Sequence, residues 1–157
     1  MVKIIEGNDT ETDILRSSLS MGIIDFLGEL RNRGITVKIV STSWYPITAD
    51  QWQEYLFHVS KLLGLGFLKE EILTVDDPGP GLSADKGKKI RDDKNIEEFL
   101  DTAMFADDSS GNIKSSIMVC NTLYIIKRKG LSIADMKYIK TSTMVCLDTI
   151  MLRFSVI

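Results

Sequence analysis

The residues of this chain best suited to chemistry form an acidic pair at the end of a short apolar run. Asp107 and Asp108 directly follow the run 102–106, and small residues that favour a helix start come next. Adjacent carboxylates repel each other and are costly to bury unless a cation or strong donors hold them. Because ligands of α/β proteins bind beyond the carboxyl ends of strands, the pair is a candidate divalent-metal site. The alternative is that Asp108 only caps a helix and Asp107 is solvated.

Two other junctions between a predicted strand and a predicted helix also carry polar residues. Ser41 and Thr42 follow the β-branched run 35–40, and Lys86 lies near the start of a helix that a serine can cap. In a parallel sheet these junctions share one edge, so hydroxyls, an ammonium group and the acidic pair could face a single ligand. Phosphate chemistry uses this set, because hydroxyls donate to phosphoryl oxygens, a lysine offsets their charge and carboxylates hold a hard cation.

The elements that must position these residues alternate along the chain. Apolar stripes at helical spacing predict amphipathic helices, most clearly after a capping box formed by Thr48 and Gln51 and before Gly64. The predicted strands are residues 2–5, 35–40, 71–75, 102–106 and 122–126. Strands that alternate with helices over short connections predict a three-layer α/β/α fold with a Rossmann-like, doubly wound parallel sheet.

Size and composition indicate a soluble globular chain. The 157 residues are 44% hydrophobic and 26% charged, with a net charge of −3. The longest basic block is 127–129, and no apolar run is long enough to span a membrane, so neither nucleic acid nor a membrane is an expected partner. Two cysteines in apolar surroundings favour a reducing, cytoplasmic location. We expect one core domain over 1–140 and an apolar tail, 141–157, that is either a final strand or a poorly packed end.

The three junctions, in this order, resemble the haloacid dehalogenase-like (HAD) superfamily, a group dominated by magnesium-dependent phosphatases. The resemblance covers about residues 13–138. It implies that Ser41 corresponds to the hydroxyl of the second motif and Lys86 to the lysine of the third. It also implies that Asp107 and Asp108 correspond to the acidic pair of the fourth, with Asp107 as the direct Mg²⁺ ligand. The expected partner is a phosphorylated substrate. The sequence indicates neither the identity of this substrate nor the oligomeric state of the protein.

The first motif of that family, Asp-x-Asp after the first strand, has no intact counterpart in this chain. In a degenerate alignment Glu6 stands at the nucleophile and Asn8 at the general acid/base. Glutamate is one methylene too long for the same in-line attack, and an amide cannot shuttle protons. Alternatively the motif lies upstream and residues 6–13 are a loop, which is the interpretation we favour. In either case the chain as given lacks a competent nucleophile.

Two functions remain open at this point. The first is a HAD-like hydrolase of phosphate esters, inactive or truncated as given. The second is a non-catalytic relative that keeps the fold as a binding or interaction module. A response-regulator receiver is rejected because its acidic pair comes first and its lysine last. No glycine-rich dinucleotide or P-loop motif occurs.

Overall fold

The computed structural model describes residue 19 and residues 22–43, 46–78, 85–92, 103–107, 109–125, 131–140 and 144–147. The helices within these ranges are α2 (Ile23–Asn32), α3 (Ala49–Leu63), α4 (Lys86–Asp92), α5 (Ser110–Ser116) and α6 (Ile133–Ile139), with a 3-10 helix, η1 (Lys69–Glu71). The strands are β1 (Thr36–Thr42), β2 (Ile72–Val75), β3 (Ala103–Asp107), β4 (Asn121–Tyr124) and β5 (Met144–Leu147).

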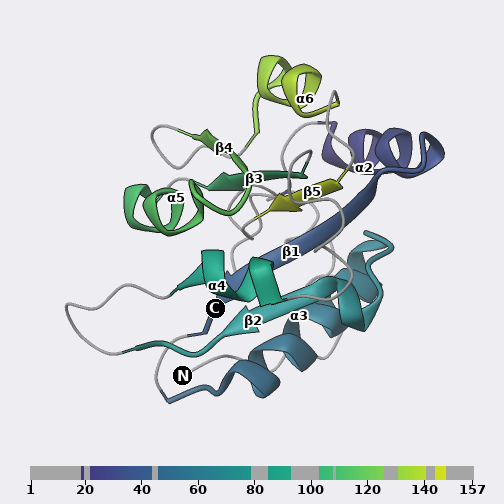
Figure 1. Ribbon diagram of the computed structural model, residues 1–157. Helices are drawn as coiled ribbons and strands as arrows, with labels where there is room; N and C mark the ends of the chain where they lie inside the picture. Colours follow the sequence, from purple (N-terminus) through teal and green to yellow (C-terminus); the bar gives the residue numbers. More distant parts are fainter. Residues whose placement is uncertain are drawn as a thin grey trace.

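The described strands form one five-stranded sheet in the order β2-β1-β5-β3-β4 (Figure 1). Every neighbouring pair is parallel. The predicted α/β class with a parallel sheet is thereby confirmed. The order of the strands in the sheet differs from their order in the sequence, because β5 lies in the middle, between β1 and β3.

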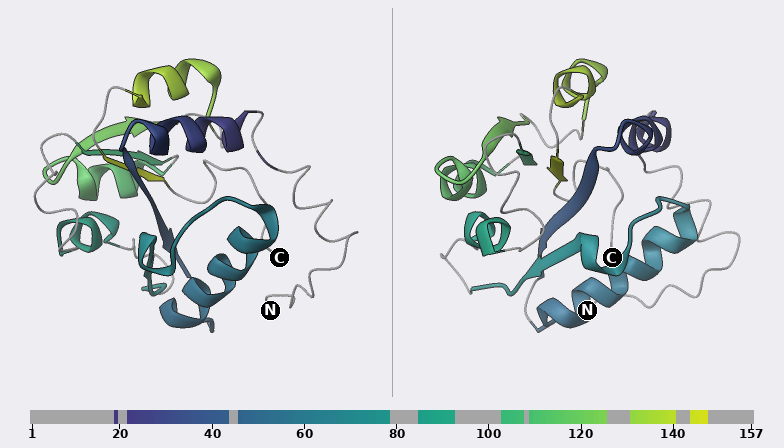
Figure 2. Two further views of the ribbon diagram at one scale, coloured as in Figure 1. Left: turned by 90° about the vertical axis from the view of Figure 1, so that its right-hand side faces the viewer. Right: turned by 45° about the vertical axis from the view of Figure 1, so that its right-hand side comes forward.

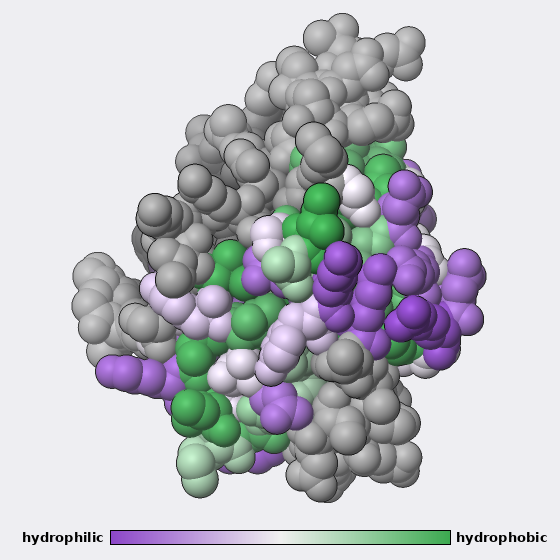
Figure 3. All heavy atoms as spheres, turned by 90° about the horizontal axis from the view of Figure 1, so that it is seen from above, coloured by the Kyte–Doolittle hydropathy of each residue, from purple (hydrophilic) through white to green (hydrophobic). Residues whose placement is uncertain are grey.

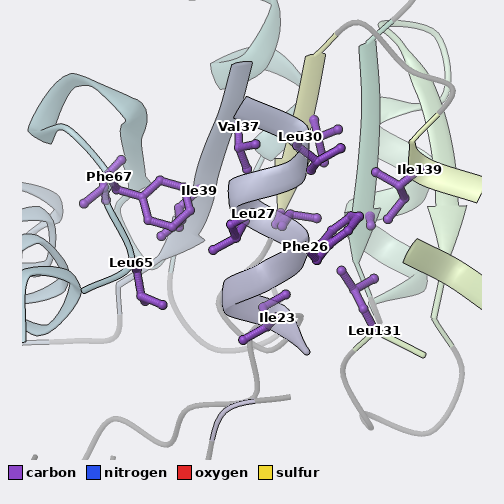
Figure 4. Close-up of a cluster of buried hydrophobic side chains, with 14 of the residues drawn as sticks. Ile23, Phe26, Leu27, Leu30, Val37, Ile39, Leu65, Phe67, Leu131 and Ile139 are labelled. Atoms are coloured by element: carbon purple, nitrogen blue, oxygen red, sulfur yellow. The ribbon is translucent and has the colours of Figure 1, made fainter. Parts of the chain in front are cut away.

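Helices cover both faces of this sheet (Figure 2). The larger apolar cluster packs α2, α3 and α6 against one face, and Figure 4 shows Phe26 and Leu27 of α2 lying among side chains of β1 and α6. The smaller cluster joins Ile90 of α4 to Phe105 and Cys146 of the sheet, with Ile113 of α5 packed against it. The sheet is therefore buried on both sides, which suits the nearly continuous apolar runs of its central strands.

The predicted helix between Thr48 and Gly64 is confirmed as α3. Thr48 accepts a hydrogen bond from the Gln51 backbone, and the Gln51 side chain accepts one from the Thr48 backbone. Gly64 ends the helix with a φ of 67°, a left-handed conformation that favours glycine. This helix matters to the candidate site because its buried Trp52 contacts β1.

Two described elements follow the predicted strand 122–126. One is α6, which begins at a capping box formed by Ser132 and Asp135. The other is β5, which lies within the predicted tail 141–157 and is buried along its whole length. Of the two alternatives for that tail, residues 144–147 form the strand, and their side chains belong to the core. The predicted strand 2–5 and most of the residues that precede α2 lie outside the described residues.

The described surface carries scattered apolar side chains among polar ones. Exposed examples are Ile24 on α2, Met118 after α5 and Ile133 on α6. In the view of Figure 3, hydrophilic residues gather along one side of the face and hydrophobic residues lie among paler, mixed neighbours. Single exposed apolar residues of this kind are normal on soluble domains.

Candidate functional site at the carboxyl edge of the sheet

A buried ion pair lies where β3 ends and α4 begins. Lys86 Nζ donates to Asp107 Oδ2 over 3.0 Å, and the two side chains are only 2% and 1% exposed. Lys86 is the first residue of α4 and Asp107 the last residue of β3. Because a buried charge without a partner is strongly unfavourable, each side chain requires the other at this position.

Asp107 receives two further hydrogen bonds from the start of α5. The Ser109 backbone donates to Oδ1 over 3.0 Å, and Asn112 Nδ2 donates to Oδ2 over 2.9 Å. Ser109 is also the N-cap of α5, since its side chain accepts from the Asn112 backbone. A carboxylate has about four acceptor positions, so three donors leave one position, on Oδ1. The strand end, the cap and the first turn of α5 together fix the direction of this carboxylate.

The residue after Lys86 must be glycine. A Cβ atom on Gly87 would lie 2.0 Å from the Ser115 carbonyl oxygen of α5. The Gly87 backbone instead approaches α5 closely enough to donate to Ser115 Oγ over 3.4 Å. This close approach of α4 to α5 is what brings the lysine of one helix to the carboxylate held by the other.

The hydroxyls of Ser41 and Thr42, at the end of β1, do not contact the ion pair of Lys86 and Asp107. Ser41 is buried, and its Oγ accepts a hydrogen bond from Trp52 Nε1 of α3 over 2.9 Å. Val37 and Ile39, which share its face of the strand, pack in the cluster with α2 and α3, whereas Val40 packs in the cluster with α4. Ser41 therefore faces the α3 side of the sheet.

The alternation along β1 turns Thr42 toward the other face, the one on which α4 and α5 lie. Thr42 is half-buried there. The strands β1 and β3 are separated by β5, so their ends lie two strand spacings, or about 10 Å, apart. The structure thus places Ser41, Thr42, Lys86 and Asp107 at one edge but brings only Lys86 and Asp107 into contact.

Several predicted site residues lie outside the described residues, namely Glu6, Asn8 and Asp108. Within the described ranges, no three His, Cys, Asp or Glu side chains are grouped so that they could hold a metal ion. Asp107 supplies a single remaining acceptor position of the kind that a hard cation prefers. The predicted Mg²⁺ site thus stays a prediction, to which the described residues contribute one carboxylate.

Sequence reasoning missed the roles of Trp52 and Asn112. Trp52 is buried on the inner side of α3, and its indole N–H, which needs an acceptor when it is buried, donates to Ser41 Oγ. Asn112 lies in the first turn of α5, and its side-chain amide donates to Asp107 Oδ2. The available signal was its position one helical turn beyond Ser109, which puts its amide beside the acidic residue that precedes the helix.

Comparisons of the chain with protein-family models, with curated proteins and with solved structures found no match. Among the described residues no helix is long and apolar enough to cross a membrane. The fold class thus follows from the structure alone, and the family resemblance and the function are matters for proposal.

Proposed function

We propose that this chain is a HAD-like protein of the Mg²⁺-dependent phosphatase type, which binds phosphate esters at the carboxyl edge of its sheet and hydrolyses them only where an attacking group is supplied from outside the described residues. The observation that carries the proposal is the buried pair of Lys86 and Asp107, held by Ser109 and Asn112 at the end of a central strand. A pair needed only for stability could be replaced by apolar residues at little cost or with a gain. Its position where α/β proteins bind ligands favours a role in binding.

Each residue has a distinct part in this proposal. Asp107 offers Mg²⁺ the remaining acceptor position on Oδ1, while Lys86 offsets the charge of its other oxygen. When bound, Mg²⁺ supplies positive charge to phosphoryl oxygens. Thr42 lies on the face of the ion pair and donates to phosphate from the end of β1, whereas Ser41, bonded to Trp52, supports the strand from the other face.

Hydrolysis of an aryl phosphate with and without Mg²⁺ tests this activity. We expect Mg²⁺-dependent turnover by the wild-type chain and none by Asp107→Asn, since the amide weakens the cation site. Asp92→Asn is a matched control, because Asp92 is exposed at the end of α4 and should leave turnover unchanged. Far-UV circular dichroism of each variant shows whether it is folded. Wild-type rates that stay at background with Mg²⁺ would contradict hydrolysis.

The second candidate is a non-catalytic phosphate-binding module. This candidate is favoured by the hydrogen bonds of Asp107. Lys86, Ser109 and Asn112 already use three of its four acceptor positions, so only one is left for a metal ion. This module would raise its unfolding temperature with inorganic phosphate and show no turnover. Thr42→Val, which removes the hydroxyl but keeps the shape of the side chain, should reduce that rise. A phosphate effect that is identical in Thr42→Val and wild type would contradict binding at this edge.

A further inference from the structure

Tyr124, the last residue of β4, lies next to the carboxylate of the candidate site. Strand β4 pairs in parallel with β3, and the register places Tyr124 level with Asp107, the last residue of β3. Neighbouring strands are about 4.8 Å apart, so a single strand spacing separates the two backbones. An aromatic residue therefore adjoins the ion pair of Lys86 and Asp107, on the side of β3 that faces away from β5.

The alternation of side chains places Tyr124 on the same face of the sheet as Asp107. One residue earlier on each strand, Ala106 belongs to the larger apolar cluster and Leu123 packs against it. The next residue of each strand points to the opposite face, on which α4 and α5 lie. Asp107 receives its hydrogen bond from Lys86 on this face. The aromatic side chain and the ion pair thus share both an edge and a face of the sheet.

The ring of Tyr124 is accessible to a ligand. The residue is 49% exposed, although its neighbour Asp107 is buried. Within the described part of the chain its hydroxyl has no hydrogen bond and its ring no aromatic partner, whereas Tyr55 stacks on Trp52 with ring centroids 5.6 Å apart. A second flat ring that covered Tyr124 would gain free energy, because stacking removes aromatic surface from water and aligns the two rings favourably.

We propose that Tyr124 stacks on the base of a nucleoside, so that the phosphate esters bound at this edge are nucleoside phosphates. This rests on the proposed function, in which Thr42 and Asp107 flank the phosphate over the end of β5. From β5 to β4 is two strand spacings, or about 10 Å. A nucleoside phosphate suits this separation because a sugar lies between its phosphate and its base. A ring esterified directly to phosphate is shorter.

A second exposed tyrosine offers a matched control. Tyr138 is 55% exposed on α6, and Met136 and Ile139 of that helix pack in the larger apolar cluster. It therefore lies on the face of the sheet opposite to Lys86 and Asp107. Replacing it removes an exposed tyrosine ring of the same kind without touching the proposed stacking position.

NMR titration in the presence of Mg²⁺ compares adenosine monophosphate with ribose phosphate, which lacks the base. The phosphorus signal of each ligand reports any hydrolysis in the same sample. The wild-type chain and Tyr138→Ala should bind adenosine monophosphate about tenfold more tightly than ribose phosphate, because a stacked base contributes a free energy of that order. Tyr124→Ala should bind the two ligands equally. Tyr124→Phe should keep the preference, since stacking needs the ring and not the hydroxyl.

Three results would overturn the proposal: equal binding of the two ligands by the wild-type chain, a preference that survives in Tyr124→Ala, or one that is lost in Tyr138→Ala. Phenyl phosphate that binds as tightly as adenosine monophosphate would reject the nucleoside. Ribose phosphate separates this failure from that of the proposed function. If ribose phosphate binds but the base adds nothing, phosphate binding stands and the stacking is wrong. If neither ligand binds, both are wrong.

A measurement on the wild-type chain alone covers the case in which Tyr124→Ala does not fold. Nuclear Overhauser effects should connect the ring protons of Tyr124 with the base protons of adenosine monophosphate, and those of Tyr138 should show none. Saturating ligand without an effect at Tyr124 would overturn the proposal.

Discussion

At the scale of single residues, Lys86 and Asp107 show how a buried charge constrains a fold. Both side chains are almost completely buried, and the carboxylate is held by one ammonium group and two further donors. Removing one partner of such a pair leaves the other charge buried, which costs more than the pair itself contributes. The effects of replacing Lys86 and Asp107 on stability should therefore not be additive.

Lys86→Met should lower the free energy of unfolding by about 3–5 kcal/mol, because Asp107 would keep its charge without its cation. Ser109 and Asn112 still donate to the carboxylate, which favours the lower end of this range. Urea denaturation measures the loss. Lys89→Met is the matched control on the same helix, exposed to solvent, and should change stability by no more than about 0.5 kcal/mol. A loss of that small size in Lys86→Met itself would contradict a buried ion pair.

Cys120 gives a prediction about pH. Burial raises the pKa of its thiol to about 11, and a hydrogen bond with the Phe105 backbone opposes the shift only in part. Between the unfolded value of 9.0 and about 11, the unfolded chain loses this proton while the folded chain keeps it. The stability contributed by Cys120 is thus complete below about pH 9 and falls as pH rises toward 11.

The comparison with Cys120→Ala isolates this contribution from other groups that titrate in alkali. The stability of the wild-type chain relative to the variant should be constant from pH 7 to pH 8.5 and decrease from about pH 9 to 11. Urea denaturation at each pH measures both chains. A difference in stability that is independent of pH through that window would show that the thiol titrates alike in the folded and unfolded chains.

At the scale of elements, the contact between α4 and α5 depends on one missing side chain. Gly87→Ala should lower stability by about 1–3 kcal/mol, since its Cβ would meet the Ser115 carbonyl oxygen and the two helices would have to separate. Separation would also disturb Lys86, so Mg²⁺-dependent effects at the edge should weaken as well. Thermal and urea unfolding measure the loss.

Gly28→Ala is the matched control for this substitution. Gly28 lies inside α2 with nothing within 4 Å of an added Cβ, so alanine should stabilise the helix by up to about 1 kcal/mol. The two glycine variants should therefore move stability in opposite directions. Equal effects at both positions would contradict the close approach of α4 to α5.

The elements that could be predicted are those with local signals. The capping box and the apolar stripe of α3, and the β-branched run of β1, specify their own structure. By contrast α6 has seven residues, too few for a clear stripe, and β5 has four within a generally apolar tail. Apolar residues of that length are compatible with a strand or with a helix, and only pairing with β1 and β3 decides.

At the scale of the whole molecule, the sheet order explains which part of the site could be predicted. The rule that parallel strands share a carboxyl edge correctly brings Lys86 and Asp107 together. It does not place β5 between β1 and β3, because that order depends on pairing with β1, more than a hundred residues earlier in the sequence, as well as with β3. Nor does it specify that Ser41 faces Trp52, since that requires the side-chain alternation in the observed register.

The central position of β5 predicts that the last part of the chain is required for the fold as a whole. A chain that ends at residue 143 loses a strand whose four residues are all buried, and it loses both ladders that join β1 to β3. Each remaining half would expose an unpaired strand edge and apolar side chains to water. We expect this chain to lose its near-UV circular dichroism and its cooperative unfolding transition.

A peptide of residues 144–157 added to the truncated chain should restore part of that signal, because it can occupy the vacant position between β1 and β3. The same peptide with Val145→Asp should not, since it would bury an unpaired charge in the core. If the truncated chain instead unfolded cooperatively at the midpoint of the full chain, β5 could not be the strand that joins the two halves of the sheet. The sheet can therefore be completed only when β5 inserts between β1 and β3, both of which precede it in the sequence.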